Sequence, residues 1–176
     1  MIVLNGGSSA GKSTLARRLQ DTLPTPWLRF SVDDLVDAIP QKGITDGSLL
    51  HIGGDGQVAT GRGWRALETS WYLGLRSMAV NGTGVIVDEV LLQGGRKQAR
   101  LRSLLAGVEV LWVGVLCAAQ IAAARETLRP DRVPGMAASQ AEVVHEGMDY
   151  GLTVDSGALT LDACVATIVS HLSPPD

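Results

Sequence analysis

The chain has 176 residues, about the length of one domain, and 45% of them are hydrophobic against 19% charged. This is an ordinary globular composition, and it excludes a disordered or low-complexity chain. The formal net charge of −3 argues against a nucleic-acid-binding protein, which would need a basic face or stripe.

Two further absences narrow the class of protein. The two cysteines, Cys117 and Cys164, lie outside any CxxC or Cys/His cluster, which argues against a disulfide framework and a structural zinc site. The N-terminus lacks a signal-peptide pattern, and no segment reaches the ~20 apolar residues that span a bilayer. We therefore expect a cytoplasmic protein with no membrane partner.

Short apolar segments alternate along the chain with segments of helical period. The predicted strands are residues 1–4, 27–32, 84–87, 108–116 and 151–154. The predicted helices are residues 12–23, 33–39, 63–80, 96–105, 118–127, 136–145 and 161–172. The glycine-rich residues 41–62 show little periodicity and predict a loop, with a hairpin as an option.

Strands that are apolar throughout and separated by helices are typical of a parallel sheet covered on both faces. The sequence therefore predicts an α/β protein of three layers with about five parallel strands, in the P-loop NTPase fold and similar to a nucleotide kinase. We expect one kinase domain over residues 1–176, with a lid at about residues 125–135.

A phosphate-binding pattern, Gly6-x-x-x-x-Gly11-Lys12-Ser13, directly follows the first predicted strand and opens the first predicted helix. Glycines let successive backbone N–H groups point at phosphate oxygens, and the helix directs its positive end at the same anion. A glycine-rich turn that binds nothing is the alternative. The residues expected to bind the nucleotide here are Gly6, Gly7, Ser8, Ser9, Ala10, Gly11, Lys12, Ser13 and Thr14.

Acidic residues follow two of the predicted strands. Asp33, which follows the second strand, is a candidate base for the attacking hydroxyl of an acceptor, or the N-cap of a helix that starts at Asp34. Asp88 is a candidate for holding Mg²⁺ together with the hydroxyl of Ser13, or for binding the acceptor. Glu89 beside it could instead activate water, which would favour plain hydrolysis.

Arginines gather in an Arg/Pro-rich segment at residues 125–135. Arginine binds phosphate with two parallel hydrogen bonds, so Arg129 and Arg132 are candidates for a lid over the nucleotide, with Arg132 also stabilising the transferring group. Surface ion pairs with Glu126 and Asp131 are the alternative interpretation of these arginines.

Two patterns on predicted helices have plainer interpretations. An apolar stripe that begins at Trp64 and is interrupted by Glu68 indicates core, with one wall of an acceptor pocket as the alternative. The basic side chains near residue 100 indicate a solvated helix face; they are Arg96, Lys97, Arg100 and Arg102.

The chain also lacks the Asn-Lys-x-Asp segment that recognises guanine, which argues against a Ras-like GTPase.

The sequence resembles the chloramphenicol phosphotransferases, small kinases that inactivate this antibiotic by phosphorylating its primary hydroxyl. The similar stretches run in the same order along nearly the whole chain: LNGGSSAGKS (4–13), LPTPWLRFSVDDL (23–35), RALE (65–68), VIVDEVLL (85–92), VLWVGVLC (110–117), RETLRPDRVPGMA (125–137) and VVHEGMDY (143–150). The resemblance implies a nucleotide-kinase-type sheet, Asp33 as the catalytic base, and Arg129 and Arg132 as lid arginines. Residues 42–63 depart most from the family.

Together these observations predict an ATP- and Mg²⁺-dependent O-phosphotransferase, with GTP as a possible donor, that acts on a hydroxylated antibiotic for self-resistance. Other acceptors stay open: a nucleoside or aminocyclitol antibiotic, such as capuramycin or hygromycin A, or a primary metabolite. A nucleotide-switched protein that is not a kinase is a further alternative. The expected partner is a small-molecule acceptor, without nucleic acid or membrane, and a homo-oligomer is possible.

Overall fold

The computed structural model describes residues 1–53, 57–128 and 135–172. Five parallel strands form the central sheet in the order β2-β5-β1-β6-β7. Their bounds are β1 Ile2–Asn5, β2 Trp27–Ser31, β5 Gly84–Glu89, β6 Leu111–Leu116 and β7 Leu152–Asp155. The predicted α/β fold with about five parallel strands is confirmed.

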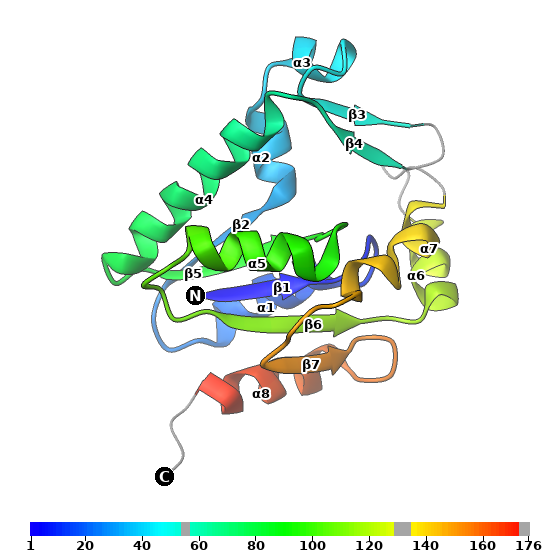
Figure 1. Ribbon diagram of the computed structural model, residues 1–176. Coiled ribbons are helices and arrows are strands. Elements are labelled where there is room, and N and C mark those ends of the chain that lie inside the picture. Colours follow the sequence, from blue (N-terminus) through cyan, green and yellow to red (C-terminus); the bar gives the residue numbers. More distant parts are fainter. Residues whose placement is uncertain (54–56, 129–134, 173–176) are drawn as a thin grey trace.

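Helices cover both faces of this sheet (Figure 1). Helices α1 (Lys12–Thr22) and α8 (Leu161–Leu172) pack together on one face, and α4 (Trp64–Val80) and α5 (Gly94–Leu104) pack together on the other. The remaining helical segments are α2 Val32–Ala38, α3 Gln41–Thr45, α6 Ala119–Glu126, α7 Met136–Gln140 and the 3-10 turn η1 Val143–His145. None of the helices in the described ranges is both long and apolar enough to cross a membrane.

The alternation of side chains along each strand divides the core into two layers. In β1, Ile2 and Leu4 join the cluster beneath α1 and α8, while Val3 joins the cluster beneath α4 and α5. In β5, Ile86 and Val87 divide in the same way, and all five of these side chains are fully buried. A strand buried on both faces has no polar side, which explains why the sequence showed short apolar runs instead of alternation.

A smaller structure stands beyond the end of the sheet and carries part of the site. Strands β3 (Leu50–Ile52) and β4 (Val58–Thr60) pair as an antiparallel hairpin that is separate from the main sheet (Figure 1). A third apolar cluster joins the hairpin to α2 and α4 through Leu35, Ile39, Leu50 and Trp64. Within the segment predicted as a loop, the described residues form a short helix, α3, and a hairpin, so the hairpin option is confirmed.

Several predicted bounds differ from the structure. The strand predicted at residues 84–87 continues through Asp88 and Glu89, because both acids still pair with the central strand β1. The strand predicted to begin at residue 108 begins at Leu111. The helix predicted over residues 136–145 ends at Gln140 and is followed by a separate 3-10 turn.

Candidate active site

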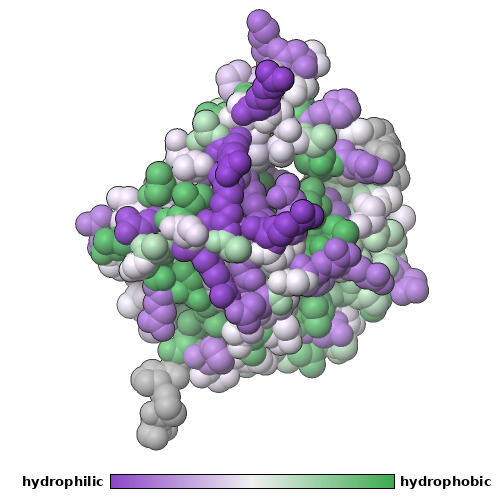
Figure 2. Space-filling model, in the orientation of Figure 1, coloured by the Kyte–Doolittle hydropathy of each residue, from purple (hydrophilic) through white to green (hydrophobic). Residues whose placement is uncertain are grey.

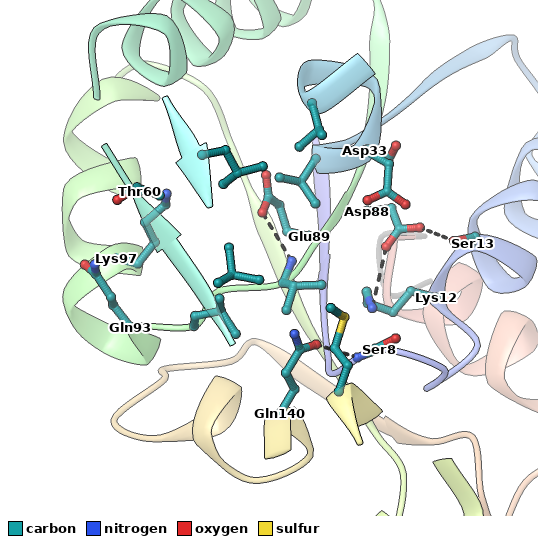
Figure 3. A pocket seen from close by; sticks show the side chains of 18 of the residues that line it. Ser8, Lys12, Ser13, Asp33, Thr60, Asp88, Glu89, Gln93, Lys97 and Gln140 are labelled. Carbon is teal, nitrogen blue, oxygen red and sulfur yellow. Dashed lines mark hydrogen bonds and ion pairs between the residues drawn. The ribbon is translucent and has the colours of Figure 1, made fainter. Parts of the chain in front are cut away.

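A cavity of about 520 Å³ lies where the phosphate loop, β5 and the hairpin meet. Its floor includes Lys12, Ser13, Asp33 and Asp88, and its walls include apolar side chains from the hairpin, α2 and the loop after β5. Figure 3 shows that these parts of the chain, remote in sequence, converge on one space. In a parallel sheet the carboxyl ends of the strands all open on the same edge, which is where ligands bind.

The phosphate loop is shaped for an anion. The hydroxyls of Ser8 and Ser9 are buried and have no hydrogen-bond partner within the described part of the chain, and both line the cavity. Ser9 adopts a left-handed φ of 58°, and a Cβ added to Gly6 would lie 2.6 Å from the carbonyl oxygen of Val115. Buried donors without partners are costly unless a ligand satisfies them, so this loop fits the phosphates of a nucleotide.

Lys12, Ser13 and Asp88 form a compact polar group at the base of the cavity. The Ser13 hydroxyl donates to Asp88 at 2.5 Å, and the Lys12 ammonium lies 3.8 Å from the same carboxylate. The Lys12 ammonium also donates to the Gly7 carbonyl at 2.8 Å. These two contacts hold the Lys12 ammonium close to the loop that would bind the phosphates.

These oxygens also suit Mg²⁺, although they cannot hold it alone. Over residues 1–53, 57–128 and 135–172, no three His, Cys, Asp or Glu side chains are grouped to hold a metal ion. Ser13 and Asp88 offer a hydroxyl and a carboxylate, which are ligands that Mg²⁺ prefers. A magnesium ion there would complete its shell with phosphate oxygens and water, as is usual for this ion.

Asp33 lies on the first turn of α2 and lines the cavity. The alternative that it caps the helix is wrong, because the helix begins at Val32 and the cap is Ser31. Asp34 completes that cap: its carboxylate accepts the Ser31 amide at 2.6 Å, and its own amide donates to the Ser31 hydroxyl at 3.2 Å. The capping box thus occupies Asp34 and leaves the Asp33 side chain on the cavity side (Figure 3).

Glu89 is buried at the edge of the cavity, and its carboxylate accepts hydrogen bonds from two neighbouring groups. Its carboxylate accepts a hydrogen bond from the hydroxyl of Tyr72, which is itself buried, and another from the Val90 amide at 3.2 Å. Burial raises the pKa of Glu89 to about 7, against the opposing effect of these two hydrogen bonds. These hydrogen bonds fix the orientation of the Glu89 carboxyl, which also lines the cavity.

The raised pKa of Glu89 predicts a pH-dependent stability. Between about pH 4.5 and 7 the folded chain retains a proton that the unfolded chain has lost, so the free energy of unfolding falls as the pH rises. The loss is about 3 kcal/mol and levels off above the folded pKa. Urea unfolding at several pH values should show this loss in the wild type and not in Glu89→Gln. Parallel pH dependences in the two proteins would contradict it.

Helix α5 contributes a cluster that the sequence did not predict. Glu68, almost fully buried on α4, binds Lys97 through one carboxylate oxygen and Arg100 through the other. The indole N–H of Trp64 also donates to Glu68, at 3.1 Å. The prediction of a solvated basic face is therefore wrong for Lys97 and Arg100, although hydrophilic side chains do gather over α4 and α5 (Figure 2). Trp64 belongs both to the apolar cluster and to the cavity wall.

The arginine-rich segment is described only at its two ends. Arg129 and Arg132 lie outside the described residues. Arg125 on α6 donates to the Ser156 carbonyl at 2.7 Å and lies close to Gly11 of the phosphate loop. The buried carboxylate of Glu126 accepts two backbone amides at the start of α7, those of Gly135 and Ala137, and it pairs with no arginine among the described residues.

Gln140, at the end of α7, is a site residue that the sequence did not predict. Its side-chain carbonyl accepts the amide of Ser8 at 2.9 Å, which ties α7 to the phosphate loop across 132 residues of sequence (Figure 3). Thr60 and Gln93 line other parts of the cavity. A lone glutamine in a helix carries no local signal of such a contact, so only the folded chain reveals it.

A phosphate loop between a central parallel strand and its helix, with one acid at the end of β5 and another just after β2, defines a P-loop phosphotransferase. The chain belongs to the chloramphenicol phosphotransferase-like family, whose model matches residues 1–173. The resemblance seen in the sequence is confirmed, and the protein is a kinase-type enzyme that uses a nucleotide and a small-molecule acceptor.

Individual relatives agree with this assignment. A Mycobacterium tuberculosis H37Rv protein named "Putative O-phosphotransferase Rv2636" is 31% identical over 170 residues, covering 90% of this chain and 75% of its own length. A sugar kinase structure from Janibacter sp. HTCC2649 matches 97% of this chain and 92% of its own, with a TM-score of 0.70 and 16% identity. The shikimate kinase of Aquifex aeolicus matches 98% and 96%, with a TM-score of 0.60 and 16% identity. At these identities the two structures show the fold alone.

Proposed function

We propose that the enzyme transfers the γ-phosphoryl group of Mg·ATP to a hydroxyl of a small acceptor, and that this acceptor is an antibiotic. The observation that carries the proposal is the single cavity that joins the phosphate loop and Asp33 to an apolar wall. The floor offers groups for phosphoryl transfer, and the wall offers a surface for the carbon skeleton of an alcohol.

Much of the wall suits an acceptor with an apolar carbon skeleton. Val36 and Leu50, together with Val58, Trp64 and Leu92, bring apolar surface to the cavity. No arginine is among the described side chains that line it, and Arg62 and Arg65, which an anionic metabolite would need nearby, are absent from the lining. An anionic primary metabolite would therefore find no bidentate arginine among the described residues that line the cavity.

Each residue of the floor has a proposed role. Asp33 would orient the acceptor hydroxyl in line with the phosphoryl group and take its proton late. Lys12 would leave its place beside Asp88 and the Gly7 carbonyl to neutralise the β- and γ-phosphate oxygens. Bound Mg²⁺ would supply further charge neutralisation, held by Ser13 and Asp88. We assign Arg129 and Arg132 to the donor phosphates as well, from the sequence alone.

Hydrolysis is the competing activity, and the apolar side chains of the cavity argue against it. Glu89, the acid that could activate water, already accepts hydrogen bonds from Tyr72 and Val90. The apolar side chains around the cavity would also keep water from the phosphoryl group once an acceptor fills it.

The proposal is tested with ATP, Mg²⁺ and a panel of hydroxylated antibiotics that includes chloramphenicol, nucleoside and aminocyclitol compounds. Mass spectrometry should find one or more products heavier by one phosphate group, formed only with the enzyme. Parallel reactions with GTP would identify the donor. Phosphorylation of none of the antibiotics would overturn the resistance function. Phosphate release that ignores every added alcohol would indicate a hydrolase.

A further inference from the structure

The far side of the cavity carries a charge arrangement that phosphoryl transfer does not use. In Figure 3, Gln93 and Lys97 of α5 lie on the opposite side of the cavity from Lys12, Ser13 and Asp33. An acceptor whose hydroxyl reaches Asp33 would therefore extend its other end toward α5. The side chains there decide which groups that end can carry.

This wall has more positive than negative charge. Glu68 is the carboxylate of the cluster, and two cations, Lys97 and Arg100, bind it. The second oxygen of Glu68 is taken by Arg100, and Arg100 is further fixed by the Thr69 hydroxyl at 2.7 Å. One carboxylate therefore pairs with two cations, and the cluster has an excess of one positive charge.

Lys97 is the member of the cluster that a ligand can reach. Its side chain is 19% exposed and lines the cavity, whereas Arg100 is absent from the lining. An ammonium group has three donors, and within the described residues Glu68 is the acceptor that Lys97 uses. Burial and the nearby Arg100 lower the pKa of Lys97 to about 8.

We propose that Lys97 determines acceptor specificity by binding an electronegative, hydrogen-bond-accepting group, such as a carbonyl or carboxylate oxygen, at the end of the acceptor remote from the reacting hydroxyl. The inference rests on the proposed function for the position of that hydroxyl. An acceptor with an ammonium group at its remote end would be repelled by the same wall. A hydrogen bond to a charged donor in a partly buried site is among the stronger ones in proteins, so the selectivity is measurable.

The test uses three para-substituted benzyl alcohols of similar size, whose remote groups are a carboxylate, a carboxamide and an aminomethyl group. Binding is measured by saturation-transfer NMR on the whole protein with Mg²⁺ and a non-hydrolysable ATP analogue. Wild type should bind the carboxylate and the carboxamide about tenfold more tightly than the aminomethyl compound, a difference of about 1.4 kcal/mol. Lys97→Met should erase this ranking, and Lys97→Arg should restore most of it.

Two controls separate specificity from structure. Arg96→Met removes one exposed positive charge from the same helix and should leave the ranking unchanged. Thermal unfolding followed by circular dichroism reports whether Lys97→Met folds, because a purely structural role would lower the melting temperature without changing the ranking. If Lys97→Met does not fold, Lys97→Gln is measured in its place.

The outcomes also separate this inference from the proposed function. Equal rankings in wild type and Lys97→Met, or no binding of any of the three alcohols, would overturn the role of Lys97. The same alcohols are incubated with ATP to measure phosphoryl transfer. A Lys97-dependent ranking without transfer to these alcohols or to the antibiotic panel would overturn the proposed function, yet support the charged wall.

Discussion

Replacing Lys12 with alanine should lower kcat by about 10²–10⁴ and leave the fold intact. Lys12 opens α1, its side chain is buried at the cavity floor, and its partners are the Gly7 carbonyl and the Asp88 carboxylate. The loss would come from transition-state charge that no other described lysine or arginine on the cavity floor could neutralise. Steady-state kinetics at saturating ATP and acceptor measure it.

The matched control for this prediction is Arg18→Ala. Arg18 is on the same helix, but it faces solvent and pairs with Asp162 at 2.9 Å. An exposed ion pair contributes little to stability, so this variant should keep wild-type turnover. Near-normal kcat in Lys12→Ala, with folding verified by circular dichroism, would show that the phosphate loop of this chain does not use its lysine for transfer.

The second large effect is expected at Asp33. Asp33→Asn keeps the size of the side chain and removes its ability to accept a proton, so kcat should fall by about 10²–10⁴ while the KM for ATP changes little. The transition state of phosphoryl transfer is loose, so the base acts late and positioning contributes most. We therefore expect a fall in kcat in the lower part of this range. Product formation by mass spectrometry and steady-state kinetics measure both parameters.

Asp37→Asn provides the charge control for Asp33. Asp37 is an exposed acid on the same short helix and is not among the residues that line the cavity. Its replacement changes the net charge equally and should leave kcat unchanged. If Asp33→Asn turned over normally, the base assignment would be wrong, and the acceptor hydroxyl would have to lose its proton without Asp33.

Local patterns in the sequence were sufficient to predict the fold and the floor of the site. The phosphate loop is contiguous, and strands that are buried on both faces, such as β1 and β5, appear as short apolar runs. Asp33 and Asp88 line the same cavity because parallel strands end on one edge. The capping box could also have been found, since Ser31 and Asp34 have the required spacing.

The contacts that were missed connect residues far apart in the sequence. Glu68 meets Lys97 and Arg100 across 29 and 32 residues, and Gln140 meets Ser8 across 132. A basic helix face looks the same in sequence whether it meets water or a buried acid on a neighbouring helix. Only the packing of α4 against α5 distinguishes the two, and helical spacing within α5 carries no information about it.

The hairpin is a separate two-stranded sheet, attached through its own apolar cluster and unpaired with the strands that hold the phosphate loop. Substitutions at Leu50, Val58 or Thr60 would therefore reshape the acceptor wall without disturbing the hydrogen bonds of the main sheet. An enzyme built in this way can change the compound it accepts while its donor machinery stays constant. The range of alcohols that this chain phosphorylates should therefore be redesigned most readily by exchanging residues 50–60 as a unit.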